Sequence, residues 1–152
     1  MRILLQRVKK ASVTIDGKVN GEIEHGLLAL VGFCEGDKKE HILPMAQKMA
    51  GLRIFEDENE KMNLSVDDVG VDILVVSQFT LYADCSHGSR PSFTGALKPD
   101  LAEEYYNIFV KTLGQITGKQ IPTGIFGADM KVELLNDGPV TVMLDSDDII
   151  KK

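Results

Sequence analysis

The stretch SQFTL, residues 77–81, places two hydroxyl side chains directly after a run of apolar residues. A strand that ends here would bring the Ser77 and Thr80 hydroxyls and nearby backbone N–H groups to the rim of a pocket. The simpler interpretation is an ordinary strand end with alternating polar and apolar side chains. A hydroxyl is a weak nucleophile without a neighbouring base. Because the sequence identifies no such base, the stretch alone favours the simpler interpretation.

A second unusual stretch is NDGPVT, residues 136–141, which lies between MKVELL and VTVML. Both flanking segments are rich in strand-forming residues, so the pattern predicts two paired strands closed by an Asn-Gly or Asp-Gly type of turn. Pro139 follows Gly138 at once and removes a backbone donor where strand pairing should resume. The hairpin prediction therefore leaves the Gly-Pro dipeptide unexplained.

Other catalytic or metal-binding chemistry has little support in the sequence. Cys85 and His87 in the loop DCSHGS suggest a Cys-His enzyme, but the partners of such dyads usually meet through the fold and not within one loop. The sequence contains no phosphate-binding or dinucleotide fingerprint and no set of well-spaced metal ligands. We therefore expect no metal and no other cofactor. Cys34 and Cys85 match no redox spacing and are expected to be free thiols.

Length and composition indicate one globular domain, residues 1–152, in which 43% of the residues are hydrophobic. No apolar run approaches the roughly 20 residues of a membrane span, and the N-terminus lacks the pattern of a signal peptide. We therefore expect a cytoplasmic protein without a membrane partner. The formal net charge of −6 argues against a protein wrapped in nucleic acid, because phosphate neutralisation dominates such binding. Contact with a short nucleic-acid end through a local basic patch remains compatible with that charge.

The elements that must position these stretches are strand-rich at first. The N-terminal part contains four β-type segments, RILLQRV, ASVTI, GEIE and GLLALVGF. Their short connections, including an Asp16-Gly17 turn, predict an antiparallel meander. The apolar run before Ser77 predicts a strand that is covered on both faces. Further strands are expected in LRIF, MNLSV and QIPTGIF.

Two segments have helical periodicity. The first follows Asp37, which forms a capping-box-like start with Glu40, and Pro44 should kink this helix or delay its start. The second begins at Pro99 and ends near Gly118, with an apolar stripe typical of a buried face. The expected fold class is α+β, with two main helices on a mostly antiparallel, barrel-like sheet.

Taken together, SQFTL and NDGPVT closely resemble the paired signature of the D-aminoacyl-tRNA deacylases, also called D-tyrosyl-tRNA deacylases. The resemblance covers nearly the whole chain and includes LLQRVKKASVTI, GLLALVG, ILVVSQFTLYAD, RPSF, FGADM and LLNDGPVT in the order of the family. It implies the same barrel-like α+β fold and a homodimer. The implied reaction hydrolyses the ester between a D-amino acid and the 3′ acceptor end of tRNA. Glycyl-tRNA is also accepted in this family, including glycine misplaced on alanine tRNA.

The resemblance also implies roles for individual residues. The residues expected around the scissile ester are Ser77, Gln78, Phe79 and Thr80. Gly138 and Pro139, joined by a cis peptide bond in the family, are expected to reach into the pocket of the other subunit. There they would exclude an L-side chain by a clash. Arg7 is expected to brace the carbonyls of this dipeptide through its planar guanidinium, the alternative being an ordinary surface ion pair. The residues expected to line the pocket are Phe126, Gly127, Ala128 and Met130.

Two mechanisms and three functions stay open at this point. Thr80 could attack the carbonyl, or the 2′-hydroxyl of the terminal adenosine could help to activate water. In the second case, backbone N–H groups near Phe79 and Thr80 would stabilise the oxyanion. We favour the second mechanism because the sequence offers no base for Thr80. The alternatives to a chiral deacylase are a noncatalytic tRNA-end binding module and a related deacylase with a trans Gly138–Pro139 bond and relaxed chirality.

Overall fold

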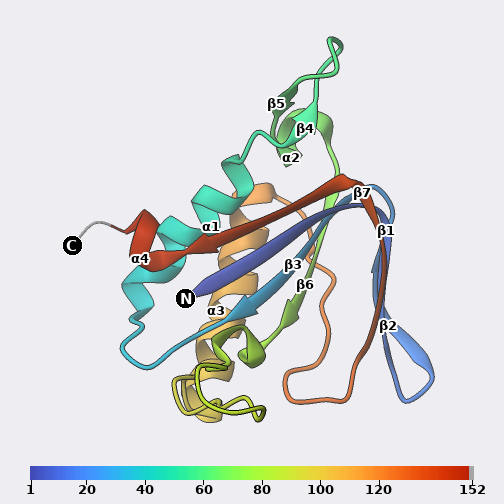
Figure 1. Ribbon diagram of the computed structural model, residues 1–152. Coiled ribbons are helices and arrows are strands. Elements are labelled where there is room, and N and C mark those ends of the chain that lie inside the picture. Colours follow the sequence, from blue (N-terminus) through green and yellow to red (C-terminus); the bar gives the residue numbers. More distant parts are fainter. Residues whose placement is uncertain (151–152) are drawn as a thin grey trace.

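The computed structural model describes residues 1–150, which fold around a five-stranded sheet (Figure 1). Its strands are β1 (Arg2–Ile15), β2 (Lys18–Ile23), β3 (Gly26–Gly32), β6 (Asp72–Ser77) and β7 (Lys131–Asp145). The central strand β1 pairs antiparallel with β2, β3 and β7, whereas β3 and β6 are parallel. Long strands β1 and β7 bend together, so the sheet curls into a half-barrel (Figure 1). The predicted fold class is thereby confirmed.

The predicted turn between β1 and β2 is also confirmed. Asp16 and Gly17 have φ values of 52° and 77°. Positive φ at both central residues is the geometry of the tight turns that match the twist of a two-stranded ribbon.

The prediction of a hairpin around NDGPVT is wrong, because β7 is one continuous strand that pairs with β1 from Asp145 to Lys131. The dipeptide lies inside this strand, where the register against β1 shifts, and the Gly138–Pro139 peptide bond is cis. The side chain of Asn136 bridges the irregularity, since its amide donates to the carbonyls of Arg7 (2.9 Å) and Val140 (3.0 Å). A side-chain amide thus supplies hydrogen bonds where the regular ladder is interrupted.

Helices α1 (Ile42–Gly51) and α3 (Pro99–Thr117) pack against each other and cover one face of the sheet (Figure 1). Strand β6 contributes side chains to hydrophobic clusters on both faces, which confirms the expectation for its apolar run. The predicted end of α3 is confirmed, because Gly118 forms its left-handed C-cap. The buried residues shared by the helices and this face include Ile3, Leu5, Leu27, Val31, Met45, Met49, Phe109 and Leu113.

The start of the first helix differs from the prediction. A 3-10 turn, η1 (Lys39–His41), precedes α1, and Pro44 lies in the first turn of the helix. A missing N–H is tolerated there, because the first N–H groups of a helix have no partner within the helix. Asp37 does not cap α1; its carboxylate accepts hydrogen bonds from the N–H of Cys34 and the Met1 ammonium, both at 2.7 Å.

The remaining elements are short. Strands β4 (Phe55–Glu56) and β5 (Met62–Leu64) confirm the predicted pair in part, and α2 (Val66–Val69) follows them. The strand expected at residues 120–126 is not formed; only Thr123 makes an isolated bridge, to Val75. Pro122 lacks an N–H, which limits pairing in this segment. Helix α4 (Ser146–Ile149) ends the described chain. Within residues 1–150, the helices are too short or too polar to cross a membrane.

Candidate functional site

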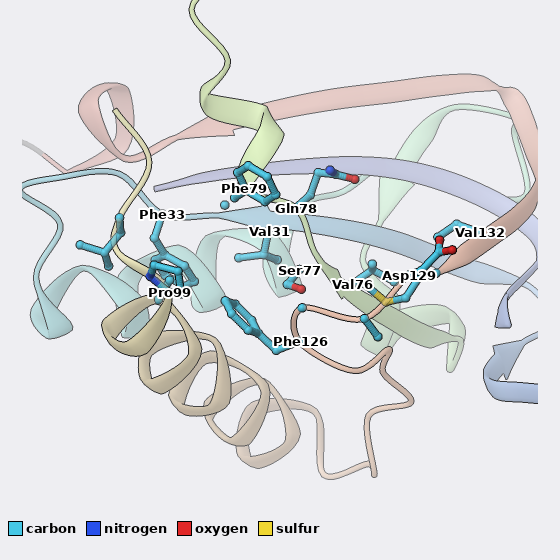
Figure 2. Close-up of a pocket in the computed structure, with 16 residues that line it drawn as sticks. Val31, Phe33, Val76, Ser77, Gln78, Phe79, Pro99, Phe126, Asp129 and Val132 are labelled. Atoms are coloured by element: carbon cyan, nitrogen blue, oxygen red, sulfur yellow. The ribbon is translucent and has the colours of Figure 1, made fainter. Parts of the chain in front are cut away.

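A pocket of about 420 Å³ opens where β6 ends, between β3, the start of α3 and the loop of residues 126–130 (Figure 2). Most of its wall is apolar, as is usual for pockets that bind small groups. The lining residues are Val31, Gly32, Phe33, Val76, Ser77, Gln78, Phe79, Leu97, Pro99, Ala102, Phe126, Gly127, Ala128, Asp129, Met130 and Val132.

The turn that follows β6 supplies the polar edge of this pocket. Gln78 leaves the strand with its N–H bonded to the carbonyl of Val31 at 2.8 Å, and the 3-10 turn η2 (Phe79–Tyr82) begins directly after it. The backbone N–H groups of Phe79 and Thr80 have no hydrogen-bond partner within the described residues. They are the unpaired donors expected at the start of a helical turn.

The first two residues of this turn, Phe79 and Thr80, are exposed, whereas Leu81 and Tyr82 are half-buried. The Phe79 ring is 55% exposed and packs edge-to-face on Phe93, with ring centroids 5.2 Å apart. The side-chain amide of Gln78 donates to the hydroxyl oxygen of Thr80. This is the one side-chain hydrogen bond of Thr80 among residues 1–150, and its partner is not a base.

The opposite wall is held by α3 through Tyr106. Its ring lies 6.0 Å from that of Phe126, measured between centroids. Its hydroxyl donates to the carbonyl of Val75 in β6 at 3.0 Å. Burial of this hydroxyl raises the pKa of Tyr106 to about 12. The side chain is therefore neutral at physiological pH and keeps its hydrogen bond to β6. Loop and strand are therefore connected through one helix residue.

The pocket offers few groups able to transfer a proton. The polar side chains that line it are those of Ser77, Gln78 and Asp129, and the exposed carboxylate of Asp129 is paired with Lys131 at 3.0 Å. Cys85 and His87 do not line the pocket, so a Cys-His dyad has no support there. Among residues 1–150, the structure contains no cluster of three or more His, Cys, Asp or Glu arranged to hold a metal.

Gly138 and Pro139 do not line the pocket of their own chain. Both residues are exposed on β7, within the stretch where the register of this strand against β1 shifts. A site that needs this dipeptide in the pocket would therefore need it from another chain.

Arg7 is 4% exposed, so the alternative of an ordinary surface ion pair is wrong. Its guanidinium donates to the carbonyls of Asp137 (3.2 Å) and Ile54 (2.8 Å). It also lies 3.4 Å from the carboxylate of Asp137. The hydrogen bond thus reaches the residue before Gly138, and within the described chain none is made to the carbonyls of Gly138 or Pro139.

The structure brings two predicted groups together around one pocket. They are Ser77, Gln78 and Phe79 on one side and Phe126, Gly127, Ala128 and Met130 on the other. Thr80 adjoins the pocket without lining it. Lining residues that the sequence did not indicate come from β3 and the start of α3, among them Val31, Phe33, Pro99 and Ala102. Their apolar types are those of core residues, so the sequence contains no signal that separates them from the core.

The chain is similar to known proteins over nearly its whole length. The family model described as D-Tyr-tRNA(Tyr) deacylase matches residues 4–145. A D-aminoacyl-tRNA deacylase from Halothermothrix orenii is 54% identical over 96% of this chain and 97% of its own. One from Koribacter versatilis is 55% identical with the same coverage.

Solved structures of similar fold are also known. One described as c-Myc DNA Unwinding Element Binding Protein has a TM-score of 0.89 and 39% identity, over 95% of this chain and 98% of its own. A probable eukaryotic D-amino acid tRNA deacylase has a TM-score of 0.82 at 17% identity, over 94% and 97% of the two chains, and shows the shared fold. The match over residues 4–145 and the close relatives place this chain in the D-Tyr-tRNA(Tyr) deacylase family, the D-aminoacyl-tRNA deacylases.

Proposed function

We propose that this protein hydrolyses the ester bond of D-aminoacyl-tRNA, releasing free tRNA and the D-amino acid. The observation that carries this proposal is the pocket in which Ser77, Gln78 and Phe79 face the loop of residues 126–130, in a chain of the deacylase family. The pocket is apolar and of a size suited to a small group. It offers backbone donors at one edge, which suits an aminoacyl ester.

In the proposed mechanism, the free N–H groups of Phe79 and Thr80 stabilise the oxyanion that develops on the ester carbonyl. Neither N–H is used by the fold within residues 1–150, which supports this role. The Thr80 hydroxyl accepts a hydrogen bond from Gln78 and has no neighbouring base, so Thr80 is poorly placed as a nucleophile. The 2′-hydroxyl of the terminal adenosine therefore helps to activate the attacking water.

We further propose a homodimer in which Gly138 and Pro139 of one chain enter the pocket of the other. The exposure of both residues, and their absence from the pocket of their own chain, support this arrangement. Carbonyls of the dipeptide would hold the ammonium group of the substrate. A D-side chain then points to open space, whereas an L-side chain strikes the dipeptide. Arg7 supports this segment through the Asp137 carbonyl.

Selection by main-chain atoms has two consequences for the substrate range. Many D-side chains are accepted, and glycine is accepted because it has no side chain to reject, including glycine mischarged on alanine tRNA. The net charge of −6 suits an enzyme that grips mainly the 3′ acceptor end of the tRNA. With this role in translation quality control, we expect the protein to act in the cytoplasm.

The direct test is to incubate the purified protein with D-tyrosyl-tRNA and to measure tRNA binding and ester hydrolysis separately. We expect many turnovers per enzyme. Binding of the tRNA without hydrolysis would contradict the proposal and would identify a noncatalytic tRNA-end binding module.

A further inference from the structure

The turn η2 is held at its far end by Arg2, a residue outside the pocket. Arg2 Nη1 donates to the carbonyl of Leu81 at 2.8 Å, and Nε donates to Asp145 Oδ2 at 3.0 Å. The guanidinium carbon lies 4.6 Å from the centre of the Tyr82 ring. One side chain thus connects the turn to the first residue of β1 and the last residue of β7.

The contact satisfies a carbonyl that the turn cannot satisfy itself. Within residues 1–150, Leu81 O accepts from Arg2 alone, because the next N–H groups are used elsewhere: Ala83 donates to Thr80 and Asp84 donates to Ser92. Carbonyls at the end of a helical turn carry partial negative charge and favour a cationic donor. Arg2 therefore caps the end of η2 that lies opposite the free N–H groups.

The Arg2–Asp145 pair is suited to holding this position. Burial acts to raise the pKa of Asp145, but the N–H of Asp147 and the Arg2 guanidinium outweigh it and hold this pKa below the usual value. Both groups are therefore charged at neutral pH. A planar guanidinium presents several donors in a fixed fork and can stack on a ring in the same geometry, whereas a lysine ammonium is a compact point charge.

The turn η2 also packs closely against the backbone of β3 at Gly32. Gly32, the register partner of Arg2, would place an added Cβ 2.6 Å from the Gln78 carbonyl oxygen and 3.3 Å from the Leu81 Cβ. The close approach is possible because glycine has no side chain. The turn is thus fixed by strand backbone below and by Arg2 at its end.

We propose that Arg2 is a positioning residue for the deacylation reaction. It holds η2 in the orientation in which the N–H groups of Phe79 and Thr80 meet the developing oxyanion. The role rests on the proposed function, and Arg2 itself does not touch the substrate. Oxyanion donors act through preorganised geometry. Loss of the Arg2 contacts therefore lowers the rate of the chemical step more than it weakens substrate binding.

The test compares wild-type enzyme with Arg2→Ala, Arg2→Lys and Lys119→Ala in steady-state hydrolysis of D-tyrosyl-tRNA. Lys119 is a matched control: its Nζ donates to the Gly70 carbonyl (3.0 Å) and to Asp72 Oδ1 (3.2 Å). Its side chain is 39% exposed, against 37% for Arg2, and it does not line the pocket. Arg2→Lys keeps a positive charge beside Asp145, and with it the attraction between the strand ends, but lacks the separate Nη1 donor that bonds the Leu81 carbonyl in the wild type.

We expect both Arg2 variants to lose kcat with little change in KM, by at least about tenfold for Arg2→Ala, since small misplacements of catalytic groups cost up to about 100-fold. Lys119→Ala should keep the wild-type kcat. Wild-type kcat in both Arg2 variants would overturn the proposal, as would a loss confined to KM.

Amide hydrogen exchange provides a measurement that does not depend on activity. In both Arg2 variants we expect faster exchange at the bonded amides of Gln78, Leu81 and Ala83, with unchanged exchange in the core of β6. Unchanged exchange at these amides, or a rise throughout the protein in Arg2→Lys, would overturn the positioning role. If the wild-type enzyme hydrolyses no D-tyrosyl-tRNA, the proposed function fails by itself, and the exchange pattern still decides whether Arg2 holds the turn.

Discussion

Thr80 carries the most obvious nucleophile near the pocket, yet its surroundings favour another role for the turn. Its hydroxyl is engaged by the Gln78 amide, and the pocket supplies no histidine or buried carboxylate. The free backbone donors of Phe79 and Thr80 remain when the hydroxyl is removed. We therefore assign catalysis to main-chain groups and to the substrate.

Thr80→Ala should keep most of the activity, with a loss below about tenfold, because removing an oxyanion donor costs about 100-fold or more and this change removes none. A substrate that ends in 2′-deoxyadenosine should lose at least about 100-fold in kcat, the usual scale of assisted proton transfer. Single-turnover hydrolysis measures both effects. Thr80→Ala is compared with the wild type on the normal substrate, and the wild type is compared on the normal and the 2′-deoxy substrates. A trapped acyl-enzyme on Thr80 would contradict the assignment.

Tyr106 in α3 is connected to β6 through the hydrogen bond that its hydroxyl donates to the Val75 carbonyl. Tyr106→Phe removes the hydrogen bond to Val75 and should lower the free energy of unfolding by about 1 kcal/mol at neutral pH. The variant should also be less sensitive to alkali. In the wild type, folding raises the pKa of Tyr106 from its usual value of 10.0 to about 12. The unfolded chain therefore releases this proton at a lower pH than the folded protein does.

The contribution of Tyr106 to stability should therefore be constant below about pH 10 and fall by about 2 kcal/mol as the pH rises toward 12. Urea unfolding of both proteins between pH 8 and 12, a range chosen around the two pKa values, measures the difference. Parallel stability curves for the wild type and Tyr106→Phe would show that Tyr106 does not titrate as described.

Gly138 in β7 has a φ of 131°, and an added Cβ would lie 2.7 Å from Val140 Cγ2 and 3.1 Å from Arg7 Nη2. Gly138→Ala should therefore destabilise the protein by about 1–3 kcal/mol and weaken discrimination between D- and L-substrates. Gly36→Ala is the matched control, because Gly36 also has a positive φ, 94°, but no atom within 4 Å of the added Cβ. Equal losses of stability and unchanged selectivity in the two variants would contradict a special role for Gly138.

Local patterns predicted those elements whose signals are local. The Asp16-Gly17 turn, the buried strand before Ser77 and the end of α3 at Gly118 were all readable from the sequence. The segment around Gly138 was not, because Gly and Pro are turn signals, whereas the continuity of β7 depends on pairing with distant β1.

The same difference applies to the site. The SQFT and FGADM stretches were indicated by residue type and resemblance. The pocket wall formed by Val31, Pro99 and Ala102 was not, because it exists only once β3 and α3 have packed. Non-local packing leaves no mark on the types of these residues.

At the scale of the whole molecule, the exposed dipeptide on β7 and the pocket that lacks it predict a site shared between two chains. The protein should sediment with twice the mass of one chain. Ala128→Trp should fill the pocket and leave the dipeptide intact, whereas Gly138→Ala alters the dipeptide and leaves the pocket intact.

Refolding these two variants together should restore sharply D-selective hydrolysis, because mixed dimers then contain one unaltered pocket facing one unaltered dipeptide. Each variant refolded alone is the control. Failure of the mixture, with mixed dimers demonstrated by mass, would show that the dipeptide does not act across the dimer.

The rates of hydrolysis of D-tyrosyl-, L-tyrosyl- and glycyl-esters on suitable tRNAs show whether a main-chain surface selects the chirality of the substrate. The D-ester and L-ester share the same tRNA, so their difference isolates chirality. We expect rapid hydrolysis of the D-ester, measurable hydrolysis of glycyl-tRNA, and no hydrolysis of the L-ester above the uncatalysed rate. Comparable rates for the D- and L-esters would contradict this selection.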